Sequence, residues 1–316
     1  MRILIVTPAA SQSRAGNRIT AVSWSQTLRE LGYEVKIDNE YHRQPCDLLI
    51  ALHARRSAKS VAKFARQCPD APRIVVLTGT DLYQDIHRHT TVRRSLALAT
   101  RIVVLQDRAL DELPVEFRGK THVIYQAATA PRVQQRSIRS AFEIVVIGHL
   151  RRVKDPFRAA YAARALEPSS HVRIVHIGRA LSASMRRRAE AEMRRNRRYI
   201  WLGELPHWKA KQRLARSRVL VMSSKMEGGA NVLSEAIAAG VPVISSRISG
   251  AIGMLGEDYP GYFDYENTDQ LRQQIIRCET DAKILRQLTN AVNGRRSLVS
   301  PTRERRSWRR LIAELE

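Results

Sequence analysis

Short apolar runs alternate with stretches of helical periodicity along the first part of the chain. The apolar runs lie at 2–8, 34–38, 47–52, 73–79, 101–106 and 121–126. Between them, apolar residues recur three or four positions apart over 17–32, 57–68 and 89–100. Strands that are apolar throughout and alternate with helices are typical of a parallel sheet covered on both faces. The pattern therefore predicts a doubly wound α/β domain over 1–129.

A polar segment, APRVQQRSIRS (130–140), interrupts this alternation, and we interpret it as a linker because it contains Pro131 and has no apolar period. The alternation then restarts, with apolar runs at 142–150, 172–178, 199–205, 218–224 and 241–246. Helical stretches fall at 156–166, 181–195, 207–216, 231–239 and 269–291. We expect a second α/β domain over 141–295 and a ligand cleft at the carboxyl ends of both sheets.

The end of the chain, 296–316, has the pattern of one more helix. Ser300 is a candidate N-cap and Pro301 stands at the first helical position. Trp308, Leu311 and Ile312 give this helix one apolar face. It could pack back on the N-terminal domain.

Composition narrows the class of ligand. The chain has 316 residues, with 54 Lys and Arg against 30 Asp and Glu, so its formal net charge is +24. Such a charge suits an anionic partner. The arginines are spread over the whole chain, however, and neither an aromatic RNA-binding strand pattern nor a helix-turn-helix signature stands out. We therefore expect no specific nucleic-acid binding, and a basic cleft for small anions such as nucleotide diphosphates fits equally well.

Three cysteines, Cys46, Cys68 and Cys278, lie far apart and form no C-x-x-C motif. This spacing argues against a disulfide framework or a zinc site and fits a reducing cytosol, so we expect a cytoplasmic protein whose cysteines are small buried hydrophobes. No run reaches the roughly 18 apolar residues that a membrane span needs.

The stretch MEGGANVLSEA (226–236) carries the most specific candidate chemistry. It lies between an apolar run and a helical stretch, and we place Asn231 as the N-cap of that helix. Gly228 and Gly229 would let backbone amides approach a ligand, and free N–H groups at a helix start favour a diphosphate. Glu235 is suited to accepting ribose hydroxyls, and Glu227 to accepting hydroxyls elsewhere on the ligand. The pattern predicts a site for a nucleotide-diphosphate sugar.

The run SSKMEGGANVLSEAIAAGVPVISSRISG (223–250) resembles the E-x7-E region of retaining GT-B glycosyltransferases, and GHLRRVKDP (148–156) resembles their G-R-L-x-x-x-K-G motif. The strings TPAASQSRAGNRITA, ALHARRSA, LTGTDLYQD, GHLRRVKDPFRAA and YIWLGELPHWKA, together with MEGGANVLSEAIAAGVPVISSRI, are similar to the selenosugar synthases of selenoneine biosynthesis. Those proteins join selenophosphate to the sugar of a UDP-sugar. The forms EGGAN and TGTDLY make this resemblance more specific than the general one.

The resemblance implies a GT-B fold of two Rossmann-like domains and assigns the donor residues. Glu235 corresponds to the ribose-binding acid, Glu227 to the acid that holds donor-sugar hydroxyls, and Lys154 to the diphosphate-binding lysine. Gly148 opens the lysine motif, and His149 stands where the family has an arginine, so Arg151 or Arg152 could supply that charge. Main-chain contacts to the sugar and diphosphate would come from Gly228, Gly229, Ala230 and Asn231.

The ends of the apolar runs in the N-terminal half predict the acceptor site. Gly16, Asn17 and Arg18 follow the first strand, and a glycine loop with an arginine suits a phosphate-like oxyanion such as selenophosphate. His53 and Arg55 follow the third strand, and Thr80 and Asp81 follow the fourth along with Thr78 and Gly79. We expect His53 to act as acid or base or to hold an anion, oriented by Asp81. His87, His89, His122, His171 and His207 have the setting of ordinary loop or surface histidines.

These assignments predict transfer of a sugar from UDP-N-acetylglucosamine or UDP-glucose to the selenium of selenophosphate. With Lys154, nearby arginines and backbone amides meeting the diphosphate charge, the reaction needs no metal and no cofactor. Three alternatives remain open: an ordinary GT-B enzyme acting on a hydroxyl acceptor, a basic protein that binds RNA or other anions, and a nucleotide-binding scaffold without activity.

Overall fold

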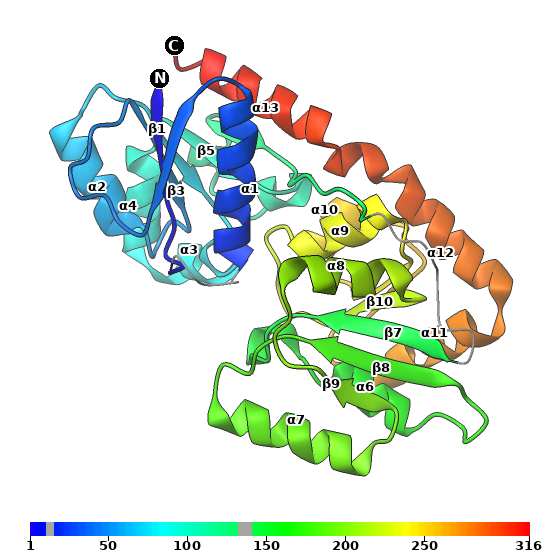
Figure 1. Cartoon of the computed structure of the whole chain (residues 1–316). Coiled ribbons are helices and arrows are strands. Elements are labelled where there is room, and N and C mark those ends of the chain that lie inside the picture. Colours follow the sequence, from blue (N-terminus) through cyan, green and yellow to red (C-terminus); the bar gives the residue numbers. More distant parts are fainter. Residues whose placement is uncertain (11–15, 132–140) are drawn as a thin grey trace. The chain divides into compact units, whose positions relative to one another are not determined.

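The computed structural model describes residues 1–10, 16–131 and 141–316 (Figure 1). Two compact units make up the chain. The first comprises Met1–Ala127, Glu227–Asn231 and Leu298–Glu316, and the second comprises Ala128–Met226 and Val232–Ser297. Most of the predicted linker, 132–140, lies outside the described residues, as do residues 11–15, where the glycine loop begins. The chain first leaves the first unit at Ala127.

The first unit is built on a six-stranded parallel sheet with the strand order β2-β1-β3-β4-β5-β6. Its strands are β1 (Arg2–Val6), β2 (Glu34–Asp38), β3 (Leu48–Leu52), β4 (Arg73–Val76), β5 (Arg101–Val104) and β6 (Thr121–Val123). Its helices are α1 (Gly16–Glu30), α2 (Ala58–Gln67), α3 (Ile86–Arg88), α4 (Thr90–Leu98), α5 (Val115–Arg118) and α13 (Pro301–Ala313). The predicted α/β fold class is confirmed.

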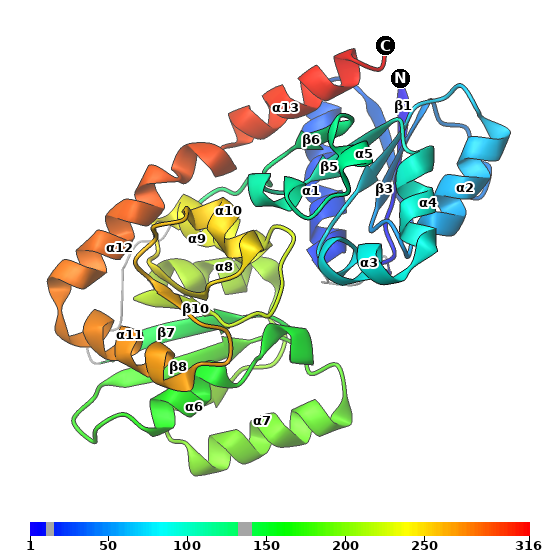
Figure 2. The same cartoon turned by 180° about the vertical axis from the view of Figure 1, so that it is seen from behind.

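Alternate residues of the central strands point to opposite faces of this sheet, as the two-residue period of a strand requires. Ile50 and Ile74 pack in one buried cluster with Trp24 of α1. Their neighbours Ala51 and Val75 pack in another, which also holds apolar residues of α2 and α4. Figures 1 and 2 show α1 and α13 on one side of the sheet and α2 and α4 on the other. Burial on both faces explains why these strands read as unbroken apolar runs.

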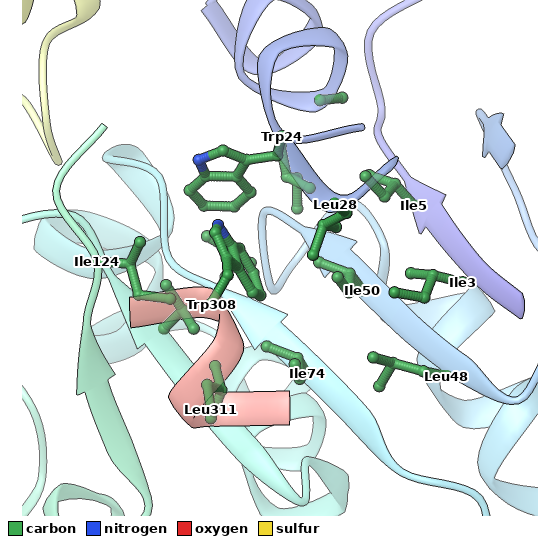
Figure 3. Packing of buried hydrophobic residues seen from close by; sticks show 14 of the residues in the cluster. Ile3, Ile5, Trp24, Leu28, Leu48, Ile50, Ile74, Ile124, Trp308 and Leu311 are labelled. Carbon is green, nitrogen blue, oxygen red and sulfur yellow. The ribbon is translucent and has the colours of Figure 1, made fainter. Parts of the chain in front are cut away.

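Helix α13 completes the core of the first unit. The indole rings of Trp24 and Trp308 are both fully buried and meet edge to face, with 4.8 Å between their centroids (Figure 3). Beside them the buried carboxylate of Glu304 accepts hydrogen bonds from Trp24 Nε1 at 3.0 Å, Thr27 Oγ1 at 2.9 Å and the backbone N–H of Ala127 at 2.8 Å. The apolar face of this helix therefore covers the α1 side of the sheet.

The second unit repeats the parallel architecture with the strand order β12-β11-β10-β7-β8-β9. Its strands are β7 (Phe142–Ile147), β8 (Val172–Ile177), β9 (Tyr199–Trp201), β10 (Val219–Met222), β11 (Val243–Ser246) and β12 (Tyr262–Phe263). Its helices are α6 (Arg158–Arg164), α7 (Ala183–Arg195), α8 (His207–Arg216), α9 (Asn231–Ala239), α10 (Ser249–Leu255), α11 (Thr268–Thr280) and α12 (Ala282–Gly294).

Three local features differ from the sequence expectation. The helix predicted over 269–291 is two helices, because Asp281 ends α11 and caps α12, its side chain accepting from Lys283 N at 2.7 Å. The short strand β12 was not predicted, and Asp81–Asp85 forms a π-helical turn. The predicted caps of the last helix are confirmed, since the side chain of Ser300 accepts from Arg303 N and Pro301 is the first helical residue.

The described residues lack the features of a membrane span and of a clustered metal site. In the part of the chain that the structure describes, no helix is both long enough and apolar enough to cross a membrane. Within residues 1–10, 16–131 and 141–316 there is also no group of three His, Cys, Asp or Glu side chains placed to hold a metal ion. Cys278 is buried, whereas Cys46 and Cys68 are only half-buried, and all three are free thiols.

Candidate functional site

The carboxyl ends of β3 and β4 bring together the predicted residues of the first unit. His53 follows β3, is 4% exposed and has a φ of +72°, a left-handed conformation that is uncommon for a residue with a side chain. Its Nε2 lies 3.2 Å from the hydroxyl of Thr80. His53 and Thr80, which are 27 positions apart, therefore share one polar cluster at this edge of the sheet.

Asp81 organises the backbone of this cluster. Its fully buried carboxylate accepts the backbone N–H groups of Ala54 at 2.9 Å, Thr78 at 2.9 Å and Gly79 at 2.8 Å. The His53 Nδ1 lies 3.7 Å from Asp81 Oδ2, within ion-pair distance when the histidine is protonated. That Asp81 orients His53 stays a prediction, and the hydroxyl of Thr80 is the closer partner of the ring.

The other predicted acceptor residues lie at the edge of the cluster and at the start of α1. Arg55 is half-exposed and its Nη1 bonds to the buried Asp85 at 3.1 Å. Gly16 begins α1 and its carbonyl accepts from Thr20 Oγ1 at 3.0 Å. Asn17 and Arg18 follow it in the first turn and are half-buried.

The segment Glu227–Asn231, which carries predicted donor residues, is part of the first unit. A methyl group at Gly228 would lie 2.5 Å from the carbonyl carbon of Thr78, and one at Gly229 would lie 2.4 Å from Leu105 Cβ. Gly228 and Gly229 are therefore required because this segment packs tightly against the segments that contain Thr78 and Leu105. The predicted main-chain contacts of Gly228 and Gly229 with a ligand stay a prediction beside this packing role.

The structure also locates Asn231 and the other residues of this segment. Asn231 is the first residue of α9 and not the residue before it. Its amide Nδ2 lies 3.4 Å from the carbonyl oxygen of Gly16. Ala230 and Glu227 are buried, at 5% and 8% exposure. The EGGAN segment thus lies beside the start of α1 and beside the turn that Asp81 organises.

In the second unit, Gly148 and Lys154 lie next to each other after β7. A methyl group at Gly148 would lie 3.9 Å from Lys154 Cδ, so the lysine stem passes the glycine at van der Waals distance. A short 3₁₀ turn, Arg152–Lys154, carries the lysine. The turn is tied to the end of β10, because Ser223 Oγ donates to the carbonyl of Asp155 at 2.8 Å and Lys225 N donates to the carbonyl of Val153 at 2.8 Å.

A buried histidine on β8 also holds the loop that begins at Gly148. His176 is fully buried on β8; its Nε2 lies 3.1 Å from the carbonyl oxygen of Gly148 and its Nδ1 lies 3.0 Å from the hydroxyl of Tyr199. Burial lowers the pKa of His176 to about 4, although the bond to Gly148 works in the opposite direction. The ring is therefore neutral near pH 7, with Nε2 donating to Gly148 and Nδ1 accepting from Tyr199.

The basic residues after Gly148 differ in how far they are exposed to solvent. Arg151 and Arg152 are exposed. His149, in the place of the expected arginine, is half-buried and its Nδ1 accepts from Arg179 N at 3.1 Å. Asp155, after Lys154, has a φ of +40° and its carboxylate pairs with Arg158 Nε at 2.6 Å.

Glu235 is 9% exposed on α9, and one of its oxygens accepts from His207 Nε2 at 2.5 Å. His207 is the first residue of α8. His207 lies at the surface, as expected, with 45% of its side chain exposed, but its ring is also bonded to the carboxylate predicted to bind ribose. Nothing local in the sequence could join these residues, which stand 28 positions apart.

Two polar side chains at other strand ends were not predicted from the sequence. Gln106 and Gln126 are buried just beyond β5 and β6. Gln106 donates to Tyr83 Oη at 3.0 Å, and Gln126 donates to Thr20 Oγ1, which also bonds Gly16. A signal for them existed, since each is a polar residue that ends an apolar run.

Two parallel α/β units with polar residues at the carboxyl ends of their strands form the architecture of the GT-B class, and the comparison with known families assigns the activity. The family model described as glycosyl transferases group 1 matches residues 131–295, more than half of the chain, and the protein belongs to that family.

Solved glycosyltransferases share the fold at low sequence identity. HepE from Anabaena, in complex with UDP and glucose, has a TM-score of 0.78 and 15% identity, over 99% of this chain and 100% of that chain. Sucrose-phosphate synthase from Thermosynechococcus elongatus has a TM-score of 0.81 and 18% identity, over 99% and 98%. The pneumococcal O-GlcNAc transferase GtfA, in complex with UDP and GlcNAc, has a TM-score of 0.68 and 18% identity, over 85% and 56%.

Proposed function

We propose that the protein is a selenosugar synthase: it transfers the sugar of a UDP-sugar, glucose or N-acetylglucosamine, to the selenium of selenophosphate. Membership of the glycosyl transferase group 1 family supports the transfer reaction. The UDP in the similar structures of HepE and GtfA supports a UDP-sugar as donor. The free cysteines are in keeping with a cytoplasmic enzyme.

One observation carries the acceptor assignment. The two strings that make the selenosugar resemblance specific, TGTDLY (78–83) and EGGAN (227–231), pack against each other in the first unit. Gly228 lies so close to Thr78 and Gly79 that any side chain at 228 would overlap their backbone. Thr80 of the first string also lies 3.2 Å from His53, so the two strings and the predicted acceptor residues form one cluster, which supports the assignment.

The donor assignment uses the groups around Gly148 and Glu235. Lys154 supplies positive charge for the diphosphate, helped by Arg151 or Arg152, and stabilises UDP as a leaving group. Glu235 accepts ribose hydroxyls, and Glu227 accepts hydroxyls of the sugar. No metal or cofactor is assigned a role in this proposal.

The proposed chemistry balances in two steps. Selenium of selenophosphate attacks the anomeric carbon, a C–Se bond forms, and the C–O bond to the diphosphate breaks with its electron pair leaving on UDP. Water then attacks phosphorus, the P–Se bond breaks with its electron pair on selenium, and the proton from water goes to the selenolate. The products are the seleno-sugar, UDP and phosphate. Selenophosphate is already anionic, so the first step needs no strong base, and His53 holds the anion or assists proton transfer in the second step.

Mass spectrometry of reactions that contain the 316-residue protein, selenophosphate and UDP-glucose or UDP-N-acetylglucosamine tests the proposal. We expect a mass for the free seleno-sugar together with UDP and phosphate. Transfer to an alcohol acceptor without any seleno-sugar would contradict it and would indicate an ordinary hydroxyl-directed enzyme.

Removal of the Glu235 carboxylate tests the donor site separately. Glu235→Ala should weaken UDP binding roughly 100-fold, because two hydroxyl bonds to a charged group are lost at about 1.5 kcal/mol each. Glu167→Ala, at an exposed position of the same unit, is the matched control and should bind UDP like the unsubstituted protein. Titration calorimetry measures both, and equal UDP affinity in all three proteins would remove Glu235 from the site.

A further inference from the structure

The carboxylate of Glu235 is held from one side only. Its Oε1 accepts from His207 Nε2 at 2.5 Å, and its side chain is about 10% exposed. Across residues 1–10, 16–131 and 141–316, His207 is the one side chain recorded as its partner. A carboxylate has two oxygens and roughly four acceptor positions, so the second oxygen is available to a ligand.

The backbone around His207 fixes the point from which its side chain extends. Pro206 precedes it with φ −52° and ψ 140°, and α8 begins at His207 itself. Ala210 and Leu214, one and two turns further along α8, are buried and anchor the helix in the second unit. The ring is less constrained by burial, since 45% of the His207 side chain is exposed. It therefore reaches from the protein surface to a nearly buried carboxylate.

The chemistry of the pair assigns a role to each side chain. With Glu235 as a carboxylate, which can only accept, Nε2 of His207 is the donor. Short bonds of this kind, in which the acceptor is charged, are the stronger ones in proteins. Glutamate otherwise loses substantial side-chain freedom when it is ordered by a ligand. A partner that orders it beforehand lowers that cost of binding.

We propose that His207 is a positioning residue for the nucleotide: it holds Oε1 of Glu235 so that Oε2 is directed at the ribose hydroxyls of UDP. This inference rests on the donor half of the proposed function, in which Glu235 binds ribose, and is independent of the acceptor. His207 itself touches no substrate. It acts only through Glu235, so its effect depends on the presence of ribose hydroxyls.

The test compares UDP with 2′,3′-dideoxy-UDP, which lacks the hydroxyls, by competition titration over a range that extends to millimolar ligand. His207→Ala should weaken UDP binding about tenfold and leave dideoxy-UDP binding unchanged. His207→Gln keeps an N–H donor and should restore most of the affinity. Lys209→Ala, at an exposed position two residues along α8, is the matched control and should change neither affinity. Circular dichroism of each variant checks that it is folded.

Two further readouts separate positioning from a merely structural role. In turnover, His207→Ala should raise the KM for the UDP-sugar while kcat stays close to that of the unsubstituted protein. In the Glu235→Ala background the same substitution should have no further effect, because the carboxylate through which His207 acts is gone.

Three outcomes would overturn the inference. An equal loss of affinity for UDP and dideoxy-UDP would mean that His207 only maintains structure. No loss for either would mean that the bond has no role in binding, and failure of the unsubstituted protein to bind UDP would overturn the donor assignment together with this inference. By contrast, a ribose-dependent effect of His207→Ala without any seleno-sugar product would reject selenophosphate as acceptor and leave the inference standing.

Discussion

The two units hold their candidate loops by opposite means. In the first, a buried carboxylate, Asp81, collects backbone N–H groups of the turns after β3 and β4. In the second, neutral donors collect backbone carbonyls: His176 takes that of Gly148, and Ser223 takes that of Asp155. The same fold can therefore hold a loop either through its backbone N–H groups or through its backbone carbonyls. The two units should therefore respond differently to loss of charge and to acid.

The largest effect should come from removing the charge in the first unit. Asp81→Ala leaves three backbone N–H groups, two of them buried, without their acceptor and should lower the free energy of unfolding by about 4 kcal/mol. Asp81→Asn keeps one acceptor oxygen and should cost roughly half as much. Urea unfolding measures both, with the exposed Asp70→Ala as control. A loss no greater than that of the control would mean that the turn does not depend on this carboxylate.

Acid should act first on the second unit. Unfolded histidine titrates near 6.5, whereas the pKa of His176 is lowered to about 4, so the unfolded state takes up the proton first as the pH falls. Between these two pH values the free energy of unfolding of this unit should fall by about 3 kcal/mol. Burial raises the pKa of Glu304 in the first unit, so the folded state binds that proton more readily and acid stabilises it.

Hydrogen exchange measures this contrast. From pH 6.5 to pH 4, amides of β7 and β8 should lose more protection than those of β1 and β3, after correction for intrinsic rates. His176→Gln, which cannot titrate, should remove the extra loss. Equal behaviour of the two sheets would contradict the proposed difference between the units.

The sequence predicted most of the fold because burial on both sheet faces leaves a continuous apolar record in each strand. The break at Asp281 was not predictable from periodicity, since apolar residues keep a helical spacing on both sides of it. The two-residue strand β12 is too short to leave a pattern.

The site was predictable to the extent that its residues stand at fixed spacing. Gly148 and Lys154 are six positions apart and do lie together. Contacts between distant residues leave no such pattern in the sequence. His207 reaches Glu235 from another helix, and the hydroxyl of Thr80 lies closer to the His53 ring than the carboxylate of Asp81 does. Such pairs are set by how helices and turns pack on the sheet, which local sequence does not specify.

A smaller effect is expected from removing the serine hydroxyl that holds the carbonyls of the lysine turn, and it shows whether this hydrogen bond contributes to UDP binding. Ser223→Ala removes the donor to the carbonyls of Asp155 and Lys154, which lie at 2.8 and 3.3 Å. One such bond contributes about 1 kcal/mol, so UDP should bind roughly fivefold more weakly as the lysine turn loosens. Ser245→Ala removes a similar buried serine bond to a carbonyl on β11 and should leave UDP affinity unchanged. Equal effects of the two variants would show that the tether has no particular connection to binding.

The smallest effect concerns the left-handed residue in each loop, His53 in the first unit and Asp155 in the second. At φ +40° a residue with a Cβ is strained by about 1 kcal/mol, and Asp155 offsets this by pairing with Arg158 Nε at 2.6 Å. Asp155→Gly loses the pair but relieves the strain, so its free energy of unfolding should stay within about 0.5 kcal/mol of the unsubstituted protein. Asp155→Ala loses the pair and keeps the strain, so it should be less stable by about 1 kcal/mol. Thermal unfolding of the two variants distinguishes them, and an alanine variant as stable as the glycine variant would mean that the turn relaxes to a right-handed conformation despite its tether to Ser223.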